Sequence, residues 1–281
     1  MKIYKALASI ILLGLSNCGN NSDQVTTEKQ IPEKIYPEIS EIVVCNTYWD
    51  NIEQIREMEP ETVLKQPETA KFLIVFRPDI PDIDSIESMR AYGPNNYQLE
   101  FSLQPYSRQT LNGHSSDLGN YIMYQAYDTR GFLENGEYRL EVVYKNGQVS
   151  SKSKVLASDL SIVEKYLSMN KEFQPVGETA IDFNEPTRLK WSMPQGGQYY
   201  AVTRLKHFIP NEPFYENILY WNNAFYMRGD AGLMMSELEI PRGIIKPDTK
   251  YVWFTEILDS NHLPEVNTAI FLPFQTFWSA R

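Results

Sequence analysis

The chain has 281 residues, of which 36 are acidic and 26 are Lys or Arg, so its formal net charge at pH 7 is −10. An acidic chain without a basic stripe gains little by neutralising phosphates, which argues against nucleic-acid binding. The length corresponds to one large domain or two modest ones. Aromatic residues make up 13% of the chain, and this Tyr-rich composition favours β-sheet.

The first 17 residues are typical of an export signal. Lys2 and Lys5 give a positive start, and an apolar stretch runs from residue 6 to residue 15. This stretch is too short to cross a bilayer, which takes about 20 residues. We therefore expect residues 1–17 to be a signal peptide, and no later segment is long and apolar enough to be a transmembrane helix.

Leu15-Ser16-Asn17-Cys18 resembles the lipobox of bacterial lipoproteins, although Asn17 replaces the usual Gly, Ala or Ser. In that family the Cys thiol takes a diacylglycerol and the chain is cut before the Cys. The resemblance implies a covalent lipid on Cys18, no other cofactor, and the membrane as a partner, because two or three acyl chains give a stable anchor. Gly19 in place of Asp favours the outer membrane if the host is Gram-negative, facing the periplasm or the cell surface. The alternative is an ordinary signal peptide with a chance Cys.

Residues 18–34 are polar and have no apolar period, so we expect a flexible tether with an end-to-end distance of roughly 20–24 Å. If Cys18 is lipidated, Cys45 has no partner within the chain. Cys45 ends the apolar run Ile42-Val43-Val44-Cys45. We therefore expect a buried, inert thiol there, with an intermolecular disulfide as the alternative.

Residues 35–158 predict an immunoglobulin-like β-sandwich. Residues 71–76 form an apolar run, and residues 137–144 alternate apolar and polar side chains as a strand does. Asn146-Gly147 then predicts a hairpin. This half lacks a signature Trp and a tyrosine-corner motif, so the assignment depends on the rhythm of its strands.

Two stretches, residues 49–58 and 159–169, have apolar residues at helical spacing. The second follows the last predicted strand of the first half. We interpret residues 159–175 as a helical linker between two domains.

Residues 176–281 resemble the fibronectin type III domain. The residues that match its motifs are Trp191, Pro194, Tyr199 or Tyr200, Ile245, Pro247, Thr249 and Tyr251. The resemblance implies a core Trp between two sheets, and a tyrosine corner in which the hydroxyl of Tyr251 contacts an upstream backbone carbonyl. The expected fold class is therefore all-β, with two tandem immunoglobulin-like or fibronectin type III-like sandwiches after the signal peptide and the tether.

Residues 206–243 lie between the expected third strand, which contains Tyr199 and Tyr200, and the expected tyrosine corner. This segment is longer than the corresponding segment of the fibronectin type III family, which predicts an inserted loop. This insert is rich in aromatic residues and amides, a composition typical of recognition surfaces. Its candidate binding residues, for a protein or a carbohydrate ligand, are Tyr215, Tyr220, Trp221, Phe225 and Tyr226. The alternative is that these side chains pack over the sandwich or form extra strands.

The sequence contains no recognisable catalytic or metal-binding motif. His114, His207 and His262 are isolated in loop-like surroundings, whereas a zinc site needs three or four convergent ligands. Asp79, Asp82 and Asp84 lie among prolines, which favours a turn over a calcium site. Arg228-Gly229-Asp230 is interpreted as a chance tripeptide.

These observations favour a membrane-anchored, non-enzymatic lipoprotein of the cell envelope that acts as a binding or scaffold module. One alternative is an accessory subunit of an envelope or secretion assembly. Another is a glycan-acting envelope hydrolase with two unrecognised carboxylates, which would require a pocket that holds both.

Overall fold

The computed structural model describes residues 36–77, 79, 81–105, 122–177, 179–212, 214, 218–228 and 235–280. The predicted signal peptide, Cys18 and the tether lie outside these residues. Strands predominate among them and form three sheets, which confirms the prediction of an all-β sandwich fold. The two α-helices of the described residues, α1 (Ile52–Met58) and α2 (Ser161–Ser168), lie within the two stretches predicted as helix.

The largest sheet has nine strands. Its main path is β12 (Ile218–Arg228), β11 (Gln198–His207), β14 (Lys250–Leu258), β15 (Thr268–Phe271), β1 (Glu41–Trp49), β2 (Glu68–Phe76) and β5 (Ile122–Asp128), with β16 (Gln275–Ser279) on β14 and β9 (Ala180–Ile181) on β16. The four-stranded sheet is β4 (Tyr97–Glu100), β3 (Ile86–Gly93), β6 (Gly136–Tyr144) and β7 (Val149–Leu156). The three-stranded sheet is β13 (Met235–Ile240), β10 (Thr187–Ser192) and β8 (Phe173–Gln174). Short 3-10 turns occur at Ile83–Ser85, Pro94–Asn96 and Leu263–Glu265.

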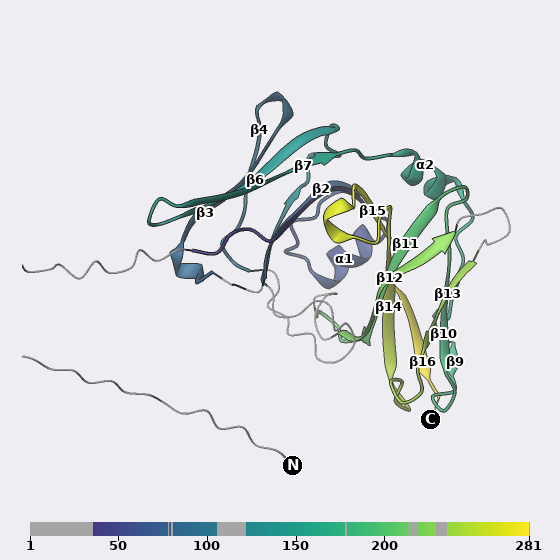
Figure 1. Ribbon diagram of the computed structural model, residues 1–281. Helices are drawn as coiled ribbons and strands as arrows, with labels where there is room; N and C mark the ends of the chain where they lie inside the picture. Colours follow the sequence, from purple (N-terminus) through teal and green to yellow (C-terminus); the bar gives the residue numbers. More distant parts are fainter. Residues whose placement is uncertain are drawn as a thin grey trace, which may run out of the picture. The chain divides into compact units, whose positions relative to one another are not determined.

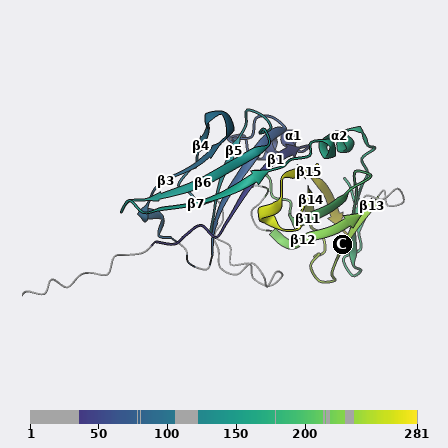
Figure 2. The ribbon, with the colours of Figure 1, turned by 45° about the horizontal axis from the view of Figure 1, so that its top comes forward.

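In the first half of the chain, strands β1, β2 and β5 pack on the four-stranded sheet, in which β3, β6 and β7 run side by side (Figure 2). The alternation predicted for β6 is present, because Tyr138, Leu140 and Val142 are all buried. The predicted hairpin joins β6 to β7, and Gly147 in its turn has a φ of 86°, which glycine adopts without strain.

In the second half, the three-stranded sheet packs on β11, β14 and β16, and Figure 1 shows β10 and β13 in a layer beside β14. Trp191 of β10 is fully buried, and its ring centroid lies 6.3 Å from that of Trp253 in the facing sheet. Trp191 therefore occupies the space between the two sheets. Helix α2 buries Val163 and Tyr166 in the same core.

The nine-stranded sheet joins the two halves. Strand β1 pairs in parallel with β15, from Asn46 opposite Thr268 to Trp49 opposite Phe271. The two faces of β1 are both buried, since Val44 lies in the first core while Cys45 packs in a separate cluster that includes Leu258. Strands on either side of the boundary expected at residues 159–175 thus belong to one sheet.

The structure contains a tyrosine corner in each half. In the second half the backbone N–H of Lys246 donates to the hydroxyl of Tyr251 at 2.7 Å, so the upstream partner is an amide and not the expected carbonyl. In the first half, where no tyrosine corner was expected, the hydroxyl of Tyr138 donates to the carbonyl oxygen of Glu134 at 3.0 Å. Both tyrosines are buried near the start of a strand, which is the geometry of this feature in β-sandwiches.

Candidate functional site

The aromatic residues singled out in the sequence fall largely on one strand. Residues 218–228 and 235–240 form strands β12 and β13, so this part of the predicted insert takes the alternative of extra strands and not that of a loop. Tyr220, Trp221, Phe225 and Tyr226 all belong to β12. Tyr215 lies outside the described residues.

Strand β12 lies at the edge of the nine-stranded sheet and pairs there with β11. Its register places Trp221 opposite Arg204, Phe225 opposite Ala201 and Tyr226 opposite Tyr200. Tyr220 is half-buried and packs against the core of the second half, while the preceding Leu219 is 38% exposed. Strand β12 is thus held in place by its pairing with β11 and by the packing of its own Tyr220 against the core of the second half.

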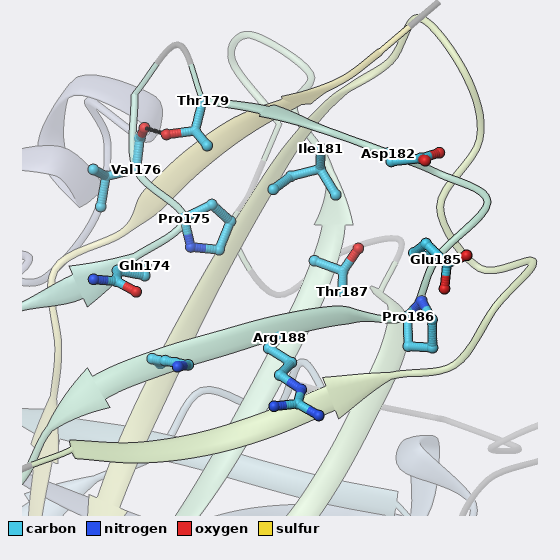
Figure 3. Close-up of a pocket in the computed structure, with 11 residues that line it drawn as sticks. Gln174, Pro175, Val176, Thr179, Ile181, Asp182, Glu185, Pro186, Thr187 and Arg188 are labelled. Atoms are coloured by element: carbon cyan, nitrogen blue, oxygen red, sulfur yellow. Dashed lines mark hydrogen bonds between the residues drawn. The ribbon is translucent and has the colours of Figure 1, made fainter.

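A second feature is a slot of about 570 Å³ between β10 and the chain that crosses from β8 to β9 (Figure 3). We call it the β9–β10 slot. It is lined by Gln174, Pro175, Val176, Thr179, Ile181, Asp182, Glu185, Pro186, Thr187, Arg188 and Lys190. Its volume falls within the range of small ligand pockets, but the slot is open to solvent along one side, where Thr179, Asp182 and Arg188 are exposed.

Thr187 is the buried polar residue of this slot. It is 3% exposed, and its Oγ1 has no hydrogen-bond partner among the described residues. A buried hydroxyl without a partner loses its hydration without compensation. Thr187 is therefore a group that a ligand in the slot would satisfy.

Most charged side chains of the slot already pair with neighbours. Arg188 lies 3.5 Å from Glu239 and Lys190 lies 3.7 Å from Glu237, while Glu185 pairs with Arg242. Asp182 differs, because its Oδ1 accepts hydrogen bonds from the backbone N–H and the side-chain amide of Asn184. Both of these donors are neutral, so the charge of Asp182 has no cationic partner among the described residues. No sequence pattern marked this slot.

A buried ion cluster lies between the halves, on the nine-stranded sheet. Glu256 is 5% exposed, and its carboxylate lies 3.1 Å from Arg204 and 3.6 Å from Lys71. Burial raises the pKa of Glu256, but the two cations more than offset this effect, so its pKa is lowered overall. The carboxylate is therefore held ionised by residues of both halves, which is the arrangement of a structural ion pair.

The other polar residues singled out in the sequence are dispersed. The Oδ1 of Asp82 accepts from the backbone N–H of Asp84, and this cap supports a turn. The rings of His207 and Tyr251 are in contact, whereas Nδ1 of His262 lies 3.4 Å from the Glu265 carboxylate. Among the described residues no group of three or more His, Cys, Asp or Glu is placed to hold a metal ion. His114, Gly229 and Asp230 lie outside those residues.

Comparison with known proteins gives little to relate this chain to a family. No family model and no curated protein matches it. One similar solved structure is a DUF4785 family protein from Legionella pneumophila, at 10% identity and a TM-score of 0.24, which covers 80% of this chain and 54% of that chain. This chain therefore spans about half the length of that protein. In the described part of the chain, no helix has the length and hydrophobicity that a membrane span requires.

Proposed function

We propose that this chain is a membrane-anchored, non-enzymatic protein of the cell envelope, which acts as a binding or scaffold module through strand β12. The observation that carries the proposal is the position of the aromatic-rich β12 at the edge of the nine-stranded sheet. An edge strand presents a row of backbone donors and acceptors to a partner. Aromatic side chains are enriched at the centres of recognition surfaces.

The anchor at Cys18 supplies the proposed location, in the outer membrane if the host is Gram-negative. The nine-stranded sheet that joins the two halves suits a scaffold, because it takes strands from both of them. If the partner is a protein of the same cell, the chain is an accessory subunit of an envelope or secretion assembly. If the partner is a glycan, the same surface is a carbohydrate-binding one.

A hydrolase is less well supported by the geometry. Asp182 and Glu185 both line the β9–β10 slot, but both are exposed and Glu185 pairs with Arg242. A glycosidase instead needs two carboxyls that face each other across a pocket, one of them in an apolar environment.

The location is tested with Cys18→Ser. We expect the unchanged chain to sediment with membranes and the variant to be released into the soluble fraction. Protease shaving of intact cells then shows which way the protein faces, with a periplasmic protein as the control. Membrane retention of Cys18→Ser would contradict the proposed anchor.

The contact surface is tested with Trp221→Ala, using immobilised envelope glycan and immobilised envelope proteins as separate probes. Trp278→Ala is the matched control, because Trp278 is an aromatic residue of β16 that is 36% exposed. We expect Trp221→Ala to weaken retention on one probe at least about tenfold, as loss of a hot-spot aromatic does, with the melting temperature unchanged. Equal retention of the two variants, or a loss of stability alone, would refute β12 as the contact surface.

A further inference from the structure

The inner strand of the three-stranded sheet has an incompletely covered edge. Strand β10 runs from Thr187 to Ser192, but β8 pairs with only Lys190 and Trp191 of it. After β8 the chain turns, and the backbone N–H of Thr179 donates to the carbonyl of Val176. The chain then joins the other sheet at β9, which pairs with β16. The first half of β10 pairs with β13 on one edge, but on the edge beside the β9–β10 slot no described strand pairs with it.

The backbone of Arg188 faces this slot. The N–H of Ser192 donates to the carbonyl of Glu172, on the side of β8. Backbone groups alternate from one edge of a strand to the other, so residues 192, 190 and 188 direct their N–H and C=O to the same side. Lys190 meets Gln174 there, whereas no described strand pairs with Arg188 on that side. Arg188 therefore offers one donor and one acceptor to an added strand.

The side chains next to this edge indicate what an added strand would carry. Thr187 is buried with its Oγ1 unpartnered, so an inward-facing residue with a small polar side chain would satisfy it. Asp182 on the opposite wall has no cationic partner among the described residues. The net charge of −10 adds a longer-range preference for cations.

We propose that the β9–β10 slot binds an extended, basic peptide segment of a partner protein, which adds to the sheet as a strand beside Arg188. The backbone of the peptide pairs with Arg188, a small polar side chain of the peptide bonds to Thr187, and a Lys or Arg pairs with Asp182. This mode of recognition obtains affinity from main-chain hydrogen bonds and specificity from alternate side chains. The site is separate from β12 and does not depend on the function proposed above.

The proposal is tested with the full-length chain and a short capped peptide that alternates Thr and Lys. Two matched peptides serve as controls, one with Glu in place of every Lys and one with N-methylated backbone amides. We expect the first peptide to bind and both controls to bind at least about tenfold more weakly. Hydrogen exchange followed by NMR gives the position, since the amide of Arg188 should exchange fast in the free chain and slowly with peptide bound.

Variants separate binding from folding. Thr187→Val keeps the shape of the side chain and removes a hydroxyl that has no partner, so the melting temperature should stay equal or rise while peptide affinity falls about tenfold, as expected for one lost hydrogen bond. Asp182→Asn should weaken binding and reduce its dependence on salt. The control is Thr203→Val, since the hydroxyl of Thr203 bonds to that of Thr255 at 2.9 Å. We expect this control to lower the melting temperature and leave peptide affinity unchanged.

Several outcomes would overturn the proposal. They are an Arg188 amide already protected in the free chain, equal binding of the Lys and Glu peptides, and peptide-induced protection in β12 instead of β10. Peptide binding that appears only after residues 19–34 are deleted would also overturn the proposal. The occupant of the slot would then be the chain's own segment and not a segment of a partner protein.

Discussion

The hydroxyl of Tyr166 in α2 donates a hydrogen bond of 2.6 Å to Oδ2 of Asp50, which directly follows strand β1. Lys171 Nζ lies 2.9 Å from the same oxygen and 4.4 Å from the centroid of the Tyr166 ring. Burial, together with this hydrogen bond, raises the pKa of Tyr166, so its hydroxyl remains a donor. The segment predicted as a linker is therefore fastened to the first half close to the point where β1 pairs with β15.

We expect Tyr166→Phe to lower the free energy of unfolding by about 1.5–3 kcal/mol, the range for hydrogen bonds to charged groups. Urea denaturation measures this loss. The control is Tyr92→Phe, because the contact of the Tyr92 hydroxyl with Glu141 is at the 3.5 Å limit and contributes little. Equal stability of the two variants would show that the Tyr166–Asp50 bond does not help to hold the halves together.

The buried carboxylate of Glu256 predicts a specific dependence on pH. Its pKa is lowered in the folded chain from an ordinary value of 4.5. The stability that it contributes is therefore fully present above about pH 4.5 and is lost as the pH falls through the folded pKa. Glu256→Gln should cost about 3–5 kcal/mol at pH 7, because it removes the buried negative charge that Lys71 and Arg204 contact.

The difference in unfolding free energy between the unchanged chain and Glu256→Gln should shrink as the pH falls below about 4.5. Urea titrations over a series of pH values measure this difference. Asp128, whose pKa is also lowered, and Asp259, whose pKa is raised by burial, are present in both proteins and cancel. A difference that stays constant down to pH 3 would refute the role given to the ion cluster.

The two tyrosine corners predict similar losses in the two halves. Tyr138→Phe removes the bond to the Glu134 carbonyl, and Tyr251→Phe leaves the Lys246 N–H without its acceptor. Each variant should lower the free energy of unfolding by about 0.5–1.5 kcal/mol, measured by urea denaturation. Tyr48→Phe is the control, because no hydrogen bond to the Tyr48 hydroxyl is found among the described residues. A loss confined to Tyr251→Phe would mean that the Tyr138 bond is not a stabilising corner.

The features that could be predicted from the sequence are local. The alternation around Tyr138 and the Asn146-Gly147 turn specify a hairpin within a single stretch of chain, and Trp191 belongs to a motif of neighbouring residues. The pairing of β1 with β15 joins segments from opposite ends of the folded part, so no local pattern reports it. Its one signal is the unbroken apolar run from Ile42 to Cys45, which is typical of a strand buried on both faces.

The candidate sites also combine features that are local in the sequence with features that depend on how distant strands are arranged. The aromatic residues of β12 were visible as a composition, but their position on an edge strand follows from the order of strands across a sheet. Nothing in the sequence around Thr187 distinguishes it from any other strand residue. Its missing partner results from the turn at Val176–Thr179, which takes the chain away from β10.

The two cysteines allow the anchor and the core to be tested in one experiment. The thiol of Cys45 is buried, and burial raises its pKa, so it should react slowly with iodoacetamide while the chain is folded. A thioether on Cys18 leaves Cys45 as the single reactive thiol of the exported chain. Mass spectrometry should therefore find no alkylation of the native membrane-extracted protein and one alkylated cysteine after unfolding in urea.

A chain whose signal peptide is blocked provides the reference, because two cysteines should then be alkylated after unfolding. Two alkylated cysteines in the membrane-extracted protein would contradict lipidation of Cys18. Rapid alkylation of Cys45 in the native protein would contradict the burial of this side chain in the cluster that includes Leu73 and Leu258.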